Sequence, residues 1–232
     1  MKQLLIENLQ KNYQKYVCII ENLKNSSYET LYLSETAVAF VIKPSNILMV
    51  AGTDEDVANA VNKVDKAYAV TFTPNEKAKT LLFNKFNLKV VDCYQYEYDK
   101  YNIDSELLSL KKLNASSENV KLICENYTLS YSEEEVYSLL NDKFILGGYI
   151  NGKICSFIGM HEERSIGLLE VFKEYRRKGI GEFMVKKAVN YFIDNGYTPF
   201  SHVRCDNLPS INMQIKLNAK KYENKVFWLV NN

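Results

Sequence analysis

The stretch that decides the fold is L-L-E-V-F-K-E-Y-R-R-K-G-I-G, residues 168–181. Its first five residues have the composition of a strand, and residues 181–195 place apolar side chains at helical spacing with lysines between them. A strand that leads through glycines into a helix N-terminus directs several unpaired backbone N–H groups at one point, and Gly179 and Gly181 allow close approach. Positive charge is added by Arg176, Arg177 and Lys178. We interpret this turn as a diphosphate-binding site.

Residues 176–181 alone also fit a second interpretation, an ordinary surface turn whose basic side chains are simply solvated. The turn lacks the G-x-x-x-x-G-K-[ST] pattern of a P-loop and the G-x-G-x-x-G pattern of a dinucleotide-binding fold. The six residues therefore leave phosphate binding and a plain turn open.

Outward from this stretch, the second half of the chain alternates strands and helices. A serine followed by three acids opens a helix at residue 132, and Asn151-Gly152 joins two strands as a hairpin. The predicted elements are that helix, strands 144–150, 154–160 and 165–172, helix 181–195, strand 200–203, helix 210–217 and strand 225–230.

The first half shows a similar succession of hairpin, strand, helix, strand, helix and strand, without a visible residue-level repeat. We predict a helix at 2–24, strands at 30–33, 37–42 and 47–51, a helix at 54–64, a strand at 67–73, a helix at 76–86 and a strand at 89–98. Two explanations stay open: a duplicated topology, or an order that any α/β domain would produce.

The two halves meet in a polar stretch. Residues 105–113 predict a short amphipathic helix, and N-A-S-S-E-N at 114–119 has the composition of a linker. We therefore expect an N-terminal α/β lobe at 1–101, a linker at 102–119 and a C-terminal domain at 120–232.

Composition narrows the function classes. Apolar residues make up 47% and charged residues 25%, and 29 Lys and Arg balance 28 Asp and Glu. This balance gives no reason to expect nucleic acid or an anionic membrane as a partner. The sequence shows no signal peptide and no apolar run of transmembrane length. Five scattered cysteines without a C-x-x-C pair argue against a disulfide framework and a metal site, and predict a reducing, cytoplasmic location.

Two motifs resemble a known family. R-R-K-G-I-G at 176–181 resembles the acyl-CoA signature [QR]-x-x-G-x-[GA] of the GNAT superfamily. H-V-R-C-D-N-L-P-S at 202–210, followed by K-L-N-A at 216–219, resembles the second half of the same fold and is similar to the C-terminal domain of glycine N-acyltransferase-like proteins. Together the motifs span about 165–219. The resemblance implies an α/β GNAT fold with a mixed sheet in the C-terminal half. The repeated order of elements then predicts a degenerate GNAT-like fold in the N-terminal half.

The resemblance also implies an acyl-CoA site. The strand at 169–171 would pair its backbone with pantetheine through a bulge that polarises the thioester carbonyl, and the amides of 177–182 would hold the diphosphate. Asn207 would lie beside the pantetheine, although it also fits a plain helix N-cap. The implied cofactor-binding residues are Leu169, Glu170, Val171, Arg176, Arg177, Lys178, Gly179, Ile180, Gly181, Glu182, Asn207 and Ser210.

The sequence identifies the residues for catalytic proton transfer less clearly than those of the acyl-CoA site. Many relatives carry a tyrosine acid seven residues after the asparagine, where this chain has Gln214. His202 is one candidate base, because an imidazole titrates near neutral pH, but a histidine packed in the core is the alternative. Glu170 and Glu163 are the carboxylate candidates. Cys205 has no identifiable base beside it that would make it a nucleophile.

The expected activity is transfer of an acetyl or other short acyl group from acyl-CoA to a primary amine of a small molecule. The alternatives are a protein N-acetyltransferase, a non-catalytic acyl-CoA sensor and a protein whose site is vestigial. The first half has only A-G-T-D-E-D at its equivalent turn, residues 51–56, and these acids would repel a diphosphate. The acceptor, the acyl chain length and the oligomeric state stay open.

Overall fold

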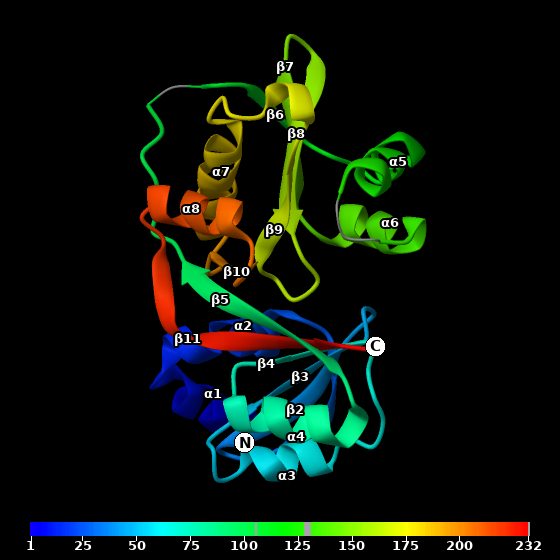
Figure 1. Cartoon of the computed structure of the whole chain (residues 1–232), viewed down its shortest axis with the longest axis vertical. Coiled ribbons are helices and arrows are strands. Elements are labelled where there is room, and N and C mark those ends of the chain that lie inside the picture. Colours follow the sequence, from blue (N-terminus) through cyan, green and yellow to red (C-terminus); the bar gives the residue numbers. More distant parts are fainter. Residues whose placement is uncertain (105, 128–130, 232) are drawn as a thin grey trace. The chain divides into compact units, whose positions relative to one another are not determined.

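The computed structural model describes residues 1–104, 106–127 and 131–231, which form two compact units (Figure 1). The first unit contains Met1–Glu97, His202–Asn212 and Lys220 onward, and the second contains Tyr98–Ser201 and Met213–Ala219. Among the described residues, no helix is both long enough and apolar enough to cross a membrane.

The first unit is built on a seven-stranded sheet in the order β1-β2-β3-β4-β11-β5-β10. The sheet is mixed, because β3 and β4 run parallel whereas β11 is antiparallel to both of its neighbours. Its elements are α1 (Lys2–Gln10), α2 (Tyr13–Asn25), β1 (Tyr28–Leu33), β2 (Ala37–Ile42), β3 (Ile47–Gly52), α3 (Val57–Asn62), β4 (Val70–Thr73), α4 (Glu76–Phe86), β5 (Lys89–Glu97), the end of β10 (Phe200–Arg204) and β11 (Lys220–Val230).

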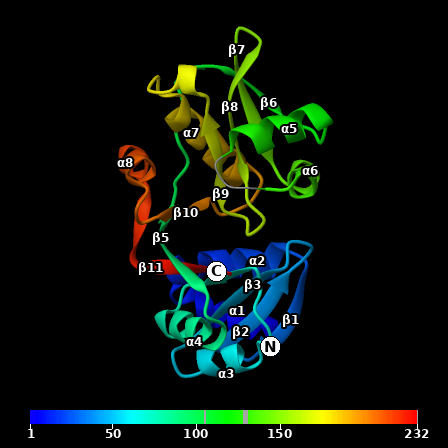
Figure 2. The same cartoon turned by 45° about the vertical axis from the view of Figure 1, so that its right-hand side comes forward.

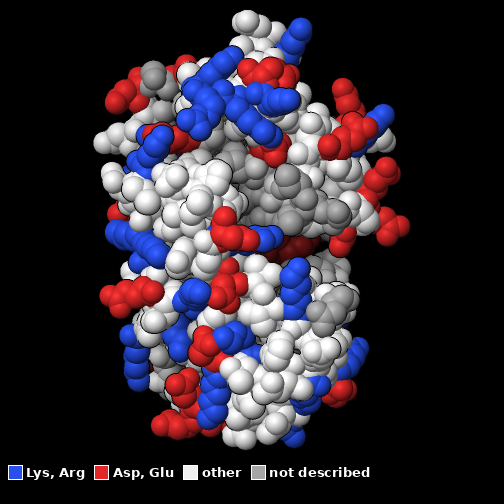
Figure 3. Space-filling view, in the orientation of Figure 1, with Lys and Arg blue, Asp and Glu red and all other residues white. Residues whose placement is uncertain are grey.

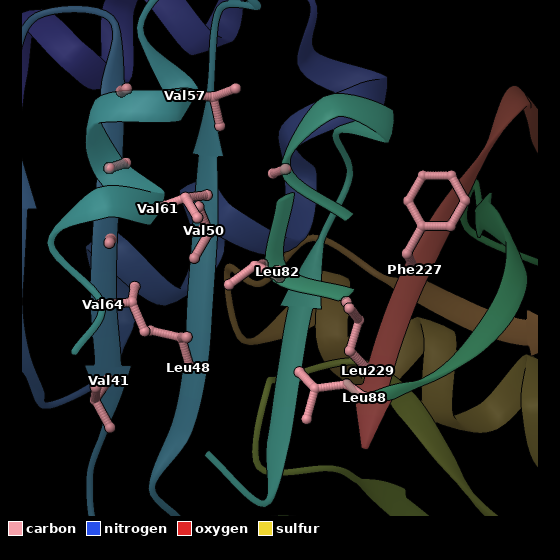
Figure 4. Close-up of a cluster of buried hydrophobic side chains, with 14 residues drawn as sticks. Val41, Leu48, Val50, Val57, Val61, Val64, Leu82, Leu88, Phe227 and Leu229 are labelled. Carbon is pink, nitrogen blue, oxygen red and sulfur yellow. The ribbon is translucent and has the colours of Figure 1, made fainter. Parts of the chain in front are cut away.

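One hydrophobic cluster of the first unit lies between this sheet and the helices α3 and α4, and α2 buries a further set of side chains. Figure 4 shows Val61 of α3 beside Val50 of β3, with Leu82 of α4 nearby. Burial of these aliphatic side chains is the main force that holds the helices on the sheet.

The position of β11 differs from what the sequence suggests. The last strand of the chain does not stay with the residues that precede it, but inserts between β4 and β5 of the first unit, where Phe227 lies opposite Thr73 on one side and Asp92 on the other. Both alternating faces of β11 carry apolar residues, which suits a central strand. The compact units therefore divide the chain differently from the ranges 1–101, 102–119 and 120–232, which remain a prediction about domains.

The second unit contains a four-stranded sheet in the order β6-β7-β8-β9, with antiparallel pairing throughout. Figures 1 and 2 show α7 on one face of this sheet and α5 and α6 on the other. The elements are β6 (Ser109–Lys112), α5 (Ser117–Asn126), α6 (Glu133–Asp142), β7 (Ile145–Ile150), β8 (Lys153–Met160), β9 (Ile166–Val171), the 3₁₀ turn η1 (Lys173–Tyr175), α7 (Ile180–Asp194) and the end of α8 (Leu208–Lys216).

Two secondary-structure predictions were wrong. Residues 105–113 were expected to be helical, but Ser109–Lys112 is the strand β6 paired with β7, and Ser105 lies outside the described residues. Buried Leu108 is followed by exposed Ser109, an alternation that fits a strand with one buried face. The helix propensity of this segment is weak, so pairing with the open edge of β7 decides its conformation. The expected helix at 2–24 is interrupted at residues 11 and 12, which separate α1 from α2.

Candidate functional site

The connection from β9 to α7 has the backbone of an open cradle. After η1, Arg177 and Gly179 have φ values of 64° and 78°, and α7 begins at Ile180. A Cβ atom at Gly179 would meet no atom within 4 Å. The turn therefore leaves free space directly above the first residues of the helix.

Backbone donors line this space. Within the described part of the chain, none of the amides from Arg177 to Glu182 has an intramolecular hydrogen-bond acceptor, and the next amide, that of Phe183, donates to Gly179 O at 3.0 Å. These N–H groups lie at the positive end of the dipole of a helix that spans 15 residues. Such a row of donors is suited to an anion with several oxygens.

Arg176 braces the cradle. Its Nε donates to Val171 O at 2.7 Å, and its guanidinium forms an ion pair with Glu170 at 2.8 Å. Glu170 is almost fully buried, so this pair attaches the beginning of the turn to the end of β9. Both residues were predicted to contact the cofactor, and the contacts found are with each other.

The remaining charges around the turn are arranged in favour of an anion. Lys178 donates to Glu174 O at 3.1 Å, and Lys186 neutralises Glu182 at 2.8 Å. The Arg177 guanidinium is exposed and has no side-chain partner among the described residues. Figure 3 shows Lys and Arg side chains gathered over the connection between β9 and α7.

Strand β9 is the edge of its sheet and contains the bulge that was predicted. Its register with β8 shifts between Phe157 and Gly159, and Leu168 has a φ of 51°. On the face toward α7, Leu169 and Val171 lie under Gly181, 3.9 and 3.7 Å from the place of a Cβ. An edge strand with free main-chain groups can accept an extended chain of amides beside it.

Polar side chains gather at the bulge. Burial raises the pKa of Tyr127, the Glu163 carboxylate adds to this effect, and a hydrogen bond to the backbone of Leu168 opposes it. Burial, followed by the Glu163 charge, also raises the pKa of Tyr131. Glu163 is buried, and its carboxylate accepts a hydrogen bond from the Ser165 hydroxyl directly before β9.

Tyr127, Tyr131 and His161 were not among the residues predicted for the site. The hydroxyl of Tyr131 lies 3.1 Å from His161 Nδ1, and His161 Nε2 lies 3.3 Å from the amide nitrogen of Leu168. The chain contains only two histidines, and His161 lies in the turn that leads from β8 to the predicted strand. The position of a rare histidine directly before the predicted strand was the one feature of the sequence that could have indicated His161 as a site residue.

The other candidate residues lie in the first unit and are not brought together with the β9 bulge within one unit. His202 on β10 stacks on Phe72 with ring centroids 4.9 Å apart, and its Nε2 lies 3.0 Å from Gln95 Oε1. Asn207 caps α8, because its Oδ1 accepts from the amide of Ser210 at 3.2 Å. These contacts are those of a packed histidine and of a helix cap.

Gln214 takes part in a buried network in the second unit. Its Oε1 accepts a hydrogen bond from the Tyr98 hydroxyl at 2.7 Å, and this hydroxyl also contacts Ser201 Oγ. The side chain that departs from the family motif is therefore held by its own tyrosine partner.

The corresponding turn of the first unit is closed. A Cβ at Gly52 would lie 2.4 Å from the Cβ of Ala37, and buried Asn75 bonds both the amide and the carbonyl of Gly52. Asp56 at the start of α3 accepts hydrogen bonds from Ser34, Thr36, Tyr32 and Asn59. A carboxylate of the chain itself thus stands where a bound anion would have to lie.

Replacement of Asp56 is expected to change how stability depends on pH. The hydrogen bond from Ser34, together with those from Asn59 and Thr36, lowers the pKa of Asp56 from 3.8 to about 2. A depressed folded-state pKa stabilises the protein fully above about pH 5, and this contribution is lost as the pH falls toward 2. Asp56→Asn should cost roughly 1–2 kcal/mol at pH 7, since partial exposure screens part of the effect, and the difference should shrink below pH 4.

Urea unfolding at a series of pH values measures this difference. Exposed Asp54 in the same turn provides the control variant, Asp54→Asn. A gap between wild type and Asp56→Asn that stays constant from pH 7 to pH 2 would contradict the assignment.

Comparisons with known proteins agree with this geometry. The model of the "Acetyltransferase (GNAT) family" matches residues 116–216. A GCN5-related N-acetyltransferase from Kribbella flavida has 9% identity and a TM-score of 0.62, over 94% of this chain and 95% of that one. A GCN5-related N-acetyltransferase-like protein from Streptococcus suis has 12% identity and a TM-score of 0.59, over 97% and 99%.

The two-unit arrangement also has a counterpart. A tandem GNAT protein from the clavulanic acid biosynthesis pathway has 12% identity and a TM-score of 0.55, over 99% of this chain and 93% of that one. Comparison with curated protein sequences finds no match. The finer similarity to glycine N-acyltransferase-like proteins is not among these findings. The fold is that of GNAT proteins, and the part of the chain at residues 116–216 matches the acetyltransferase (GNAT) family.

Proposed function

We propose that this protein is an N-acyltransferase that moves an acetyl or other short acyl group from acyl-CoA to a primary amine of a small molecule. One observation carries the proposal: the unpaired amides from Arg177 to Glu182 directly follow a bulged strand with a free edge. Donors for a diphosphate and a pairing edge for a pantetheine amide chain thus occur in the order in which acyl-CoA presents these groups.

The chain's own groups would then act in sequence. The amides of the turn hold the diphosphate, and Arg177 and Lys178 add charge. The main-chain groups of Leu169 to Val171 other than Val171 O, which is bonded to Arg176, pair with the pantetheine. This pairing places the thioester near the bulge. The amine attacks the carbonyl carbon, the C–S bond breaks, and the amine's proton passes to a base. Orientation of the two substrates supplies much of the rate.

We assign the base to Glu163. This carboxylate is buried beside the bulge, where its charge acts on Tyr127 and Tyr131. Glu170 is engaged with Arg176, and His202 packs against Phe72 in the first unit. A negative carboxylate beside aromatic rings also suits an ammonium group before it loses its proton. The thiolate is a sufficiently stable leaving group to depart without a tyrosine at position 214.

Titration with acetyl-CoA, followed by assays of thiol release over a panel of small primary amines and amine-bearing peptides, tests this function. Binding with turnover of small amines supports it, and turnover of peptides alone would assign a protein N-acetyltransferase. Binding without turnover would assign a sensor, and absence of binding would contradict the whole proposal. Since all five cysteines are free thiols, we place the reaction in the cytoplasm.

Calorimetry should find about one acetyl-CoA per chain. The turn of the second unit is open, whereas that of the first is filled by the Ala37 contact and the Asp56 carboxylate. A second diphosphate would have to displace buried hydrogen bonds and face three acids at 54–56. A stoichiometry near two would contradict this interpretation of the first unit.

A further inference from the structure

His161 is held in a fixed orientation beside the β9 bulge. Its amide donates to Ser165 O, and the amide of Arg164 donates to its carbonyl, each at 2.9 Å. This turn directs the imidazole back along β9, where its two nitrogens contact Leu168 and Tyr131.

These contacts determine the tautomer. An amide N–H can only donate, so Nε2 must accept the hydrogen bond from Leu168 and cannot carry a proton. The proton of the neutral ring is therefore on Nδ1, which donates to the Tyr131 hydroxyl oxygen. His161 is therefore a neutral imidazole that accepts a hydrogen bond from the Leu168 amide.

That amide belongs to the most strained residue of the strand. Leu168 is fully buried and has a φ of 51°, in a region that a branched side chain adopts rarely. Its side chain packs with Val136 and Phe157 in the core below α5 and α6. The side chain is therefore fixed by the core, and the amide is held separately by His161, with the Tyr127 hydroxyl also bonded to the Leu168 backbone.

Gly167 points to the same contact. A Cβ atom at residue 167 would lie 2.0 Å from His161 Nε2, so any side chain there would displace the imidazole. The φ of Gly167 does not require glycine. Close approach of the ring to the strand is the reason for a residue without a side chain at this position.

We propose that His161 is a positioning residue for acyl transfer, which fixes the β9 bulge by accepting the Leu168 amide. Leu169 to Val171 follow directly after the bulge, so the direction of their main-chain groups depends on the conformation of Leu168. A bulge released from His161 would turn these groups away from the thioester and pantetheine. This inference rests on the proposed function for its catalytic consequence, but not for its structural one.

Two substitutions of His161 distinguish the roles of its two ring nitrogens. Glutamine can place an amide oxygen near the position of Nε2, whereas asparagine reaches only the position of Nδ1. We expect His161→Asn to lower kcat roughly 100-fold, because misplacement of about 1 Å near the reacting atoms has this effect. The Kd for CoA, held mainly by the α7 turn, should change less than about threefold. His161→Gln should keep kcat within about tenfold of wild type.

Amide hydrogen exchange at Leu168, measured by NMR on the free protein, tests the contact without any substrate. Exchange should become roughly fivefold faster or more in His161→Asn, and stay near the wild-type rate in His161→Gln. Gly167→Ala should reproduce the asparagine result with residue 161 unchanged. Equal exchange and equal kcat in the two His161 variants would overturn the proposal. If wild type fails to bind acetyl-CoA, the proposed function falls, while the exchange comparison still decides whether His161 holds the bulge.

Discussion

Simultaneous replacement of Gly179 and Gly181 by valine is expected to weaken acetyl-CoA binding by roughly 10²–10⁴-fold. The added side chains would stand between the diphosphate and the amides of the turn. Loss of two charge-assisted hydrogen bonds costs about 1.5–3 kcal/mol each, which corresponds to this range in Kd. Isothermal titration calorimetry measures it.

The opposite end of the same helix offers a matched control. Gly196 follows α7, has a φ of 75° against 78° at Gly179, and likewise has no neighbour within 4 Å of a Cβ. Gly196→Val therefore reproduces the backbone strain of a left-handed residue, about 1–2 kcal/mol, without touching the turn. A milder variant is Gly181→Ala, whose Cβ would make only ordinary contacts. A folded double variant that binds acetyl-CoA as wild type does would refute the diphosphate site.

Glu163→Gln is expected to lower kcat/KM roughly 10²–10⁴-fold, the usual contribution of a positioned general base. The amide keeps an oxygen that can accept from the Ser165 hydroxyl, so this contact is retained while the basic group is lost. Affinity for acetyl-CoA should not change, because the carboxylate lies at the bulge and not at the turn. Steady-state kinetics with a reactive amine, together with calorimetry, separate the two effects.

Two variants serve as comparisons. Glu162 is the neighbouring acid and pairs with Lys143 at 3.5 Å, so Glu162→Gln removes a nearby charge without removing the proposed base. His202→Ala tests the alternative base: if His202 takes the proton, this variant loses 10²–10⁴-fold and its rate no longer rises through the imidazole range. Retained activity in Glu163→Gln, with loss in His202→Ala, would transfer the assignment to His202.

Several elements followed from short-range patterns in the sequence. The hairpin at Asn151-Gly152 and the helix opened by Ser132 with a capping box through Glu135 both formed as predicted. The strand, turn and helix around residues 168–181 did as well. In each case the residues that specify the conformation lie within a few positions of one another, so the chain carries the information locally.

The features that the sequence did not show involve partners that are distant in the chain. Residues 109–112 became a strand because β7 offered an edge, and nothing within the segment encodes that edge. Strand β11 resembles the closing strand of the C-terminal half, but its pairing with β4 and β5 depends on residues more than a hundred positions away. Apolar alternation predicts a strand and its buried face but does not select the neighbour.

The candidate site likewise has one part that the sequence predicted and another that only the folded structure revealed. The glycines and basic residues of the α7 turn were visible in the sequence, because a diphosphate cradle is made of consecutive amides. The contact of His161 with the Leu168 amide, the approach of Tyr131, and the closure of the first unit's turn by Asp56 each join residues from separate elements. Such contacts arise only when packing brings those elements together, so they could be found in the folded chain and not in the pattern of residues along it.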